Sequence, residues 1–216
     1  PYRNGDLKAR GPAEKLGVAL SPGGLLRGGG HWTRDLVFSP NGKKMYVSVG
    51  SRSNNSDSAG EADRARIFEF NPDGSGQKVY AWGIRNAVGI AMRPGSDELW
   101  MSTNERDELG DNLVPDYISH VKPGGFYGWP WFYLGDHQDP RHKGKHPELA
   151  SQVIVPDVLV QSHSASLNLC FYDGKQFPTE YRGDIFAAFH GSWNRARLTG
   201  YKIVRVPLEN GKARGE

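Results

Sequence analysis

The chain has 216 residues with a net charge of +3 at neutral pH, and 37% of its residues are hydrophobic. This length is sufficient for one well-packed core or for part of a larger domain, and the composition excludes an intrinsically disordered chain. The 27 basic residues are interspersed with 24 acidic ones, and no apolar run is long enough to cross a bilayer, so the sequence predicts no nucleic-acid partner and no membrane span.

The first segment with a clear signal is 28–35, in which three glycines precede His31. It runs into 36–49, where two stretches rich in β-branched and aromatic residues flank a Pro-Asn-Gly turn. This pattern predicts a β-hairpin. His31 therefore stands at the mouth of a hairpin, where an imidazole is well suited to proton transfer. The alternative is a histidine that only bonds a local backbone carbonyl.

The hairpin pattern returns twice along the chain, over 89–102 and, in a looser form, over 169–191. A further strand and turn follow each hairpin, over 67–74, 118–125 and 201–207. The repeats are spaced more widely than the about 40–45 residues of a four-stranded propeller blade. Each repeat therefore predicts one blade with insertions, the largest of them over 128–162.

We predict an all-β fold, a partial β-propeller of about three blades that takes up all of residues 1–216. Residues 1–11 resemble residues 207–215, so the chain begins and ends at the same phase of the repeat. Because a closed propeller has at least four blades, we expect a fragment truncated at both ends, with an open sheet face at each. A self-contained β-sandwich is the alternative that short strands and turns also allow.

Several polar residues share one phase of the repeat. Arg85 and Asn86 precede the second hairpin as His31 precedes the first, so we expect the three to converge on one face of the propeller. Arg85 carries forked donors that suit a planar anionic ligand, although a structural ion pair is equally compatible with the sequence. His163 and the segment 190–195 also lie beside predicted blade strands, and this phase favours their participation in a site.

Three other segments contain chemically suggestive residues. The oxygen-rich segment 104–112 follows a strand and suits a hard cation such as calcium, or is a solvated acidic loop. The aromatic cluster 126–133 suits a planar ligand or a sugar, or is ordinary core packing. The histidines of the next loop have no spacing that closes a metal site, so we predict no zinc there: His137, His142 and His146.

Five motifs in this order resemble the glucose/sorbosone dehydrogenase family, quinoproteins that use pyrroloquinoline quinone (PQQ), and most resemble its sorbosone or pyranose dehydrogenase branch. The motifs are Gly30-His31-Trp32-Thr33-Arg34-Asp35, Gly83-Ile84-Arg85-Asn86, Asn104-Glu105-Arg106-Asp107, Gly124-Gly125-Phe126-Tyr127-Gly128-Trp129-Pro130 and His190-Gly191-Ser192-Trp193-Asn194-Arg195. The resemblance implies a six-bladed propeller in which PQQ lies across the axial pocket with a bound calcium ion.

The resemblance also implies roles for individual residues. The family's base falls on His31, which takes the hydroxyl proton while hydride passes to the quinone. Arg85 and Asn86 fall beside the quinone, so that Arg85 is both a catalytic and a cofactor-binding candidate. The calcium ligands fall on Glu105 and Arg106 through their backbone carbonyls.

Two departures from the glucose-oxidising branch stand out. Val88 occupies a position where that branch has a glutamine, which favours the sorbosone-like branch. The lysine that the glucose branch sets against PQQ is replaced by the region of Trp193, Asn194 and Arg195, where Arg195 or Arg197 is a candidate for a PQQ carboxylate. These residues, with His163, complete the predicted cofactor site.

The sequence thus predicts part of a PQQ- and calcium-dependent dehydrogenase, periplasmic or secreted. It oxidises a sugar or sugar aldehyde of the sorbosone or aldopyranose type and passes electrons to an acceptor such as a cytochrome or quinone, although the fragment alone is not expected to turn over. The first alternative is a non-catalytic propeller that binds a carbohydrate or a protein partner. A calcium-dependent propeller hydrolase is a weaker third, since it requires an axial cluster of acidic residues.

Overall fold

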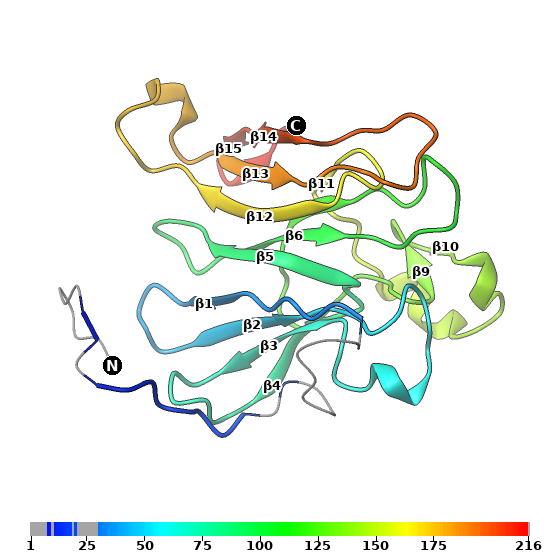
Figure 1. Ribbon diagram of the computed structural model, residues 1–216, viewed down its shortest axis with the longest axis horizontal. Helices are drawn as coiled ribbons and strands as arrows, with labels where there is room; N and C mark the ends of the chain where they lie inside the picture. Colours follow the sequence, from blue (N-terminus) through cyan, green and yellow to red (C-terminus); the bar gives the residue numbers. More distant parts are fainter. Residues whose placement is uncertain (1–7, 10, 19, 21–29, 216) are drawn as a thin grey trace.

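Short antiparallel strands separated by turns make up most of the chain, as the computed structural model shows for residues 8, 9, 11–18, 20 and 30–215 (Figure 1). The predicted similarity of residues 1–11 to 207–215 falls largely outside these described residues. The described part contains only short 3₁₀ helices, none of which has the length and apolar character required to cross a bilayer. The prediction of an all-β fold is confirmed.

The first sheet follows the first predicted hairpin. Its strand order is β1–β2–β3–β4–β8, and the bounds are β1 (Leu36–Phe38), β2 (Met45–Val49), β3 (Arg66–Phe70), β4 (Lys78–Trp82) and β8 (Gly125–Phe126). The β1–β2 turn contains Gly42 at a φ of +67°, a conformation that glycine adopts without strain. Asn41 accepts hydrogen bonds inside the same turn from Ser39 Oγ and from the Lys43 amide. Only β8 is parallel to its neighbour, β4.

The second and third sheets contain the other two predicted hairpins. The second has the order β11–β7–β6–β5, with β5 (Asn86–Met92), β6 (Leu99–Asn104), β7 (Tyr117–His120) and β11 (Val158–Leu159). The third consists of β12 (Ser166–Phe171), β13 (Ile185–Phe189) and β14 (Lys202–Val206). All three hairpins and the strand after each are therefore confirmed.

The predicted insertion over 128–162 is only partly an insertion, because it includes β11, the outer strand of the second sheet. Its other elements form a separate lobe beside the sheets: the hairpin of β9 (Phe132–Tyr133) and β10 (His137–Gln138), and the 3₁₀ helices η2 (Pro140–His142) and η3 (Pro147–Gln152). The remaining short elements are η1 (Ala59–Glu61), η4 (Thr179–Tyr181), β15 (Leu208–Glu209) and β16 (Lys212–Ala213).

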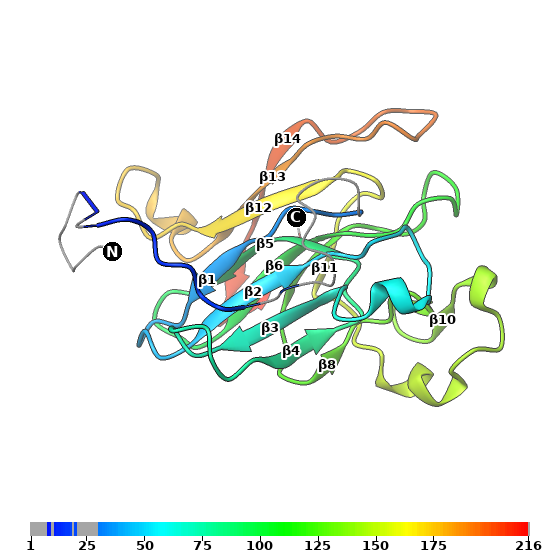
Figure 2. The same ribbon diagram turned by 60° about the horizontal axis from the view of Figure 1, so that its bottom comes forward.

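The three sheets succeed one another with β1, β5 and β12 as neighbouring inner strands (Figures 1 and 2). The backbones of β5 and β12 approach so closely that a Cβ on Gly89 would lie 2.6 Å from the Asn168 Cα. Between the first two sheets, the Asp35 carboxylate accepts the Ile90 amide at 2.8 Å. The sheets are therefore arranged side by side, as successive blades require.

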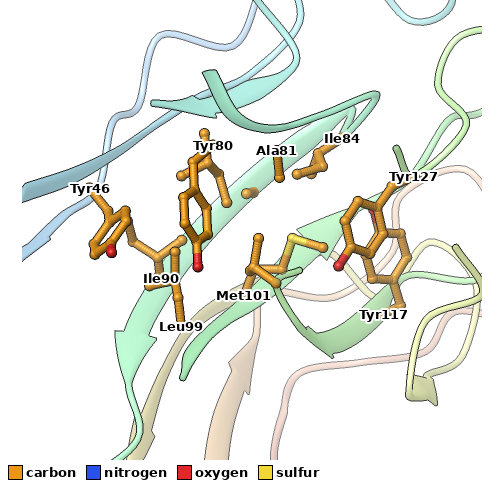
Figure 3. Packing of buried hydrophobic residues seen from close by; sticks show 12 residues of the cluster. Tyr46, Tyr80, Ala81, Ile84, Ile90, Leu99, Met101, Tyr117 and Tyr127 are labelled. Atoms are coloured by element: carbon orange, nitrogen blue, oxygen red, sulfur yellow. The ribbon is translucent and has the colours of Figure 1, made fainter. Parts of the chain in front are cut away.

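Two hydrophobic clusters fill the spaces between successive sheets. The first lies between the first and second sheets and is centred on Leu99 and Met101, which are fully buried (Figure 3). The second lies between the second and third sheets and includes Trp100, Ile185 and Val206. Beyond these clusters the outer faces remain exposed at Leu36 and Phe38 on β1 and at Ile203 on β14.

Leu99→Ala in the full-length protein is expected to lower the free energy of unfolding by about 2–5 kcal/mol, because it leaves a cavity between two sheets. The same substitution at Leu159, which is 44% exposed on β11, is expected to cost less than about 1 kcal/mol. Urea unfolding followed by tryptophan fluorescence measures both. Equal losses would contradict this location of the core.

Candidate active site

Two adjoining cavities open where several strands begin or end. The first, here called the axial cavity, has a volume of about 150 Å³. The second, the rim cavity, has a volume of about 400 Å³ and shares Asp107, His163, Trp193 and Asn194 with the first. The other residues lining the axial cavity are His31, Arg85, Asn104, Glu105, Asp116 and Ala165. Six of the predicted site residues thus meet at one cavity: His31, Arg85, Glu105, His163, Trp193 and Asn194.

The hydrogen bonds of His31 determine which of its ring nitrogens carries the proton. Nδ1 lies 3.1 Å from both the carbonyl oxygen and Oγ of Ser51. Since Ser51 Oγ donates its own hydrogen to the Ser53 carbonyl, both partners of Nδ1 are acceptors. We therefore assign the proton of the neutral ring to Nδ1, which leaves Nε2 as an acceptor that has no partner among the described residues.

The surroundings of His31 favour its neutral form. Burial is the main cause that lowers its pKa to about 4, and the positive charges of Arg85 and Arg64 act in the same direction. The Arg64 guanidinium also donates to the carbonyls of Gly50, His31 and Ser51, which fixes the backbone on which the ring is mounted. At neutral pH the imidazole is therefore an unprotonated acceptor held in one orientation.

Gly50 allows His31 and Asn86 to pack closely behind the cavity. A Cβ at this position would lie 2.2 Å from Asn86 Oδ1 and 2.7 Å from the His31 Cβ, so only glycine fits. Asn86 is buried and does not line either cavity, and its Oδ1 has no hydrogen-bond partner among the described residues. The structure therefore places Asn86 beside His31 as predicted, but behind it.

Most donors of Arg85 are already engaged within the chain. Its guanidinium donates to the Asn54 carbonyl, to Asn54 Oδ1, to the Glu105 carbonyl at 2.8 Å and to Asp107 Oδ2 at 3.2 Å. Four of its five N–H groups are thereby used, and one is left for a ligand. The ion pair that was the structural alternative for Arg85 is present, together with a position on the cavity wall.

The Asp107 carboxylate joins three side chains of the cavity wall. It falls in the oxygen-rich segment 104–112 but was not itself predicted as a site residue. In addition to Arg85, its carboxylate accepts Asn194 Nδ2 at 2.8 Å and contacts His163 Nδ1 at 3.1 Å. His163 Nε2 lies 3.0 Å from the Gly110 carbonyl, so both nitrogens of this histidine have protein partners. His163 thus holds the wall together and offers no free nitrogen to a ligand.

Asp116, a second residue that was not predicted, fixes the backbone around the candidate cation ligands. Its carboxylate accepts the amides of Glu105, Ala165 and Ser166, and so joins the end of β6 to the start of β12. Burial raises the pKa of Asp116 to about 7, against the effect of these donors. No local pattern in the sequence singles out Asp116, because its partners follow β6 and begin β12.

Glu105 and Arg106 direct their side chains away from the cavity. The Glu105 carboxylate accepts the Arg106 amide and Nε, and the fully buried Arg106 guanidinium also donates to the Pro130 and Phe132 carbonyls and to Asp139. Their side chains are thus not available to a cation; Glu105 lines the axial cavity, whereas Arg106 lines neither cavity. No cluster of three or more His, Cys, Asp or Glu side chains suited to a metal occurs among the described residues.

The C-terminal part of the predicted site lies at the rim. Trp193 is 82% exposed, so one large aromatic surface faces solvent at the mouth of both cavities. Arg195 does not line either cavity, and it donates to the Ser162 carbonyl and to Asn112 Oδ1. Its Nε is buried without a partner among the described residues.

The three histidines of the 128–162 segment are separated by their partners. His142 Nε2 contacts the Asn55 carbonyl, His137 Nδ1 contacts the Leu134 carbonyl, and His146 contacts Glu148. Each has a different protein partner, so the structure does not gather them into one site.

Comparison with known families now places this geometry in context. The sequence profile of the family described as Glucose / Sorbosone dehydrogenase matches residues 23–214. The chain belongs to the glucose/sorbosone dehydrogenase family. This confirms the family inferred from the five motifs.

The chain is also similar to curated relatives along most of its length. The chain is 31% identical over 182 residues to an uncharacterised protein of Borreliella burgdorferi (83% of this chain, 47% of the relative). It is 27% identical over 172 residues to the aldose sugar dehydrogenase YliI of Escherichia coli (71% and 43%). It thus spans less than half the length of these curated relatives.

Two solved structures show the same fold over most of the chain. The calcium structure of a Trichoderma reesei carbohydrate-active enzyme of family AA12 superposes with a TM-score of 0.71 at 21% identity (85% of this chain, 55% of that one). The holo form of the PQQ domain of Coprinopsis cinerea pyranose dehydrogenase gives a TM-score of 0.67 at 22% identity (84% and 54%).

Gly50→Ala is expected to lower the free energy of unfolding by about 1–3 kcal/mol, because the added methyl overlaps the Asn86 and His31 side chains. Gly17→Ala is the matched control, since nothing lies within 4 Å of a Cβ there. Urea unfolding of both variants measures the difference. A Gly50→Ala protein as stable as the control would show that this packing is not tight.

The His31 ring is expected to remain neutral down to about pH 4, as followed by NMR titration of its imidazole. Arg85→Gln removes the second-largest cause of the lowered pKa, so the pKa should rise while burial keeps it below 6.5. Arg93→Gln, which removes an arginine paired with Glu98, is the control and should leave the His31 titration unchanged. A His31 that titrates near 6.5 in the parent protein would contradict the assigned environment.

Proposed function

We propose that the chain is part of a PQQ- and calcium-dependent dehydrogenase that oxidises a sugar or sugar aldehyde of the sorbosone or aldopyranose type. Six blades, of which this chain supplies about three, would form the complete propeller, and a cytochrome or quinone would accept the electrons. We propose a periplasmic or secreted location. The observation that carries the proposal is the free Nε2 of a neutral His31 at a cavity that also presents a guanidinium and an exposed indole.

The donor set suits both groups that the family implies. Arg85, Asn194 and the exposed Trp193 offer charge, an amide and an aromatic surface to a planar polyanionic quinone. For calcium, the Glu105 carbonyl retains a lone pair beyond its bond from Arg85, and the Asp107 carboxylate lines the same cavity.

The mechanism assigned to the chain concerns the substrate's proton. Bound PQQ would be the acceptor of the hydride. His31 Nε2 accepts the hydroxyl proton of the sugar, because its lone pair is free and its Nδ1–H is held by Ser51. Arg85 would stabilise negative charge that develops on the substrate oxygen as its proton leaves, while the Asp107 contacts keep Arg85 and Asn194 in place.

His31→Ala in the full-length protein loaded with PQQ and calcium is expected to reduce kcat for aldose oxidation by about 10²–10⁴-fold, the usual contribution of a general base. PQQ uptake, followed by absorbance, should remain within a few-fold of the parent. His137→Ala, which removes an exposed histidine of the lobe, should leave both unchanged.

Two results would contradict the proposal in different ways. Loss of both turnover and PQQ uptake in His31→Ala would make His31 structural. If the parent protein binds no quinone and reduces no dye with aldoses or sorbosone, the dehydrogenase proposal fails, and a non-catalytic propeller that binds a carbohydrate or protein is the better description.

A further inference from the structure

A third cavity, here called the tryptophan cavity, has a volume of about 240 Å³. Its walls come from η1 and the turn before it, from the start of β3, and from Trp82, Trp129 and Trp131. The Asn54 carbonyl accepts both Trp129 Nε1 at 2.9 Å and Arg85 Nε at 3.2 Å, so one carbonyl connects a wall residue of the tryptophan cavity to a wall residue of the axial cavity.

The indoles of the tryptophan cavity are fixed in place before any ligand arrives. Trp82 stacks on Phe126 with ring centroids 4.0 Å apart, and Trp131 packs on His146 at 4.1 Å. Trp129 is held by its bond to Asn54. Trp82 and Trp131 are only half-buried, so part of each ring remains available at the cavity. Rigid aromatic walls of this kind bind ring-shaped ligands at little entropic cost.

The carboxylates around the tryptophan cavity already have partners. Asp57 accepts Lys145 Nζ at 2.7 Å and Trp131 Nε1 at 3.4 Å. Glu61 accepts the amides of Arg52 and Ser53 and the Ser53 hydroxyl.

The arginines of this cavity are occupied as well. Arg66 pairs with Asp63, and Arg64 donates to three backbone carbonyls. The lining thus contains two carboxylates and two guanidinium groups, and all four have hydrogen-bond partners within the chain. The cavity therefore favours neither an anion nor a cation. A neutral ligand with apolar ring faces and polar edges suits it best.

We propose that the tryptophan cavity is a carbohydrate-binding subsite that takes one neutral pyranose ring, separate from the axial cavity. Its volume lies below the roughly 300 Å³ at which pockets for drug-sized ligands begin, which suits a single ring. In this subsite the indoles contact the C–H faces of the ring. Asp57 and Ser56, which also line the cavity, bond its hydroxyl groups. The choice of a sugar rests on the proposed function, whereas the cavity and its charge balance do not.

The test uses the full-length protein without cofactor and methyl β-D-glucopyranoside, whose blocked anomeric oxygen prevents oxidation at C1. Saturation-transfer NMR and calorimetry measure its binding. Ala62 is exposed and lines the cavity, so Ala62→Trp fills the cavity without removing a polar contact. This variant should weaken binding at least tenfold. Trp131→Ala should do the same while leaving the oxidation of free aldoses within a few-fold of the parent.

Trp193→Ala is the matched control, because it removes an indole from the rim of the axial cavity. Methyl glucoside binding that survives Trp193→Ala and fails in Ala62→Trp supports the subsite. Absence of saturable binding in the parent overturns it, and so does binding that Trp193→Ala abolishes and Ala62→Trp leaves intact. If the protein binds the glucoside in the supported pattern but oxidises no sugar, the subsite stands and the dehydrogenase proposal falls.

Discussion

The carboxylate of Asp107 holds together side chains that come from three separate parts of the chain. Arg85 arrives from the start of β5, His163 from the turn before β12, and Asn194 from the loop between β13 and β14. Arg85 is buried, and a buried guanidinium without a counter-charge is costly. The second and third sheets therefore keep a fixed relation at the cavity, since the acceptor and its donors are distributed across both.

A second buried network connects this region to the lobe that contains Trp129 and Trp131. The Arg106 guanidinium has no exposed surface and donates to the carbonyls of Pro130 and Phe132 and to the Asp139 carboxylate. Asp139 in turn accepts Arg141. Arg106, which follows the predicted calcium ligand Glu105, thus orders the backbone on either side of Trp131 in the tryptophan cavity. The two cavities therefore share part of their structural support.

The hairpins could be predicted from the sequence, and so could the residues that stand at the same position relative to each hairpin, because both depend on local patterns. Pro-Asn-Gly and Pro-Gly turns fix where strands end, and strand ends decide which side chains reach the axial cavity. Gly50, Asp107 and Asp116 depend instead on contacts between sheets, which no local pattern records. Asn86 illustrates the same limit, since its phase brought it next to His31 but could not show that it packs behind Gly50.

Of the two interpretations of His31 that the sequence left open, the structure shows the first, and the first is a condition for the second. Nδ1 satisfies a local carbonyl and hydroxyl of Ser51, as a purely structural histidine would. That bond fixes the tautomer, and the tautomer leaves Nε2 unprotonated at the cavity. Burial and the neighbouring guanidinium of Arg85 then keep the ring neutral by lowering its pKa to about 4. A ring held this way is unprotonated over the neutral pH range, and the charge of Arg85 that favours the neutral ring also opposes its protonation, so a role as base requires negative charge nearby when the proton arrives.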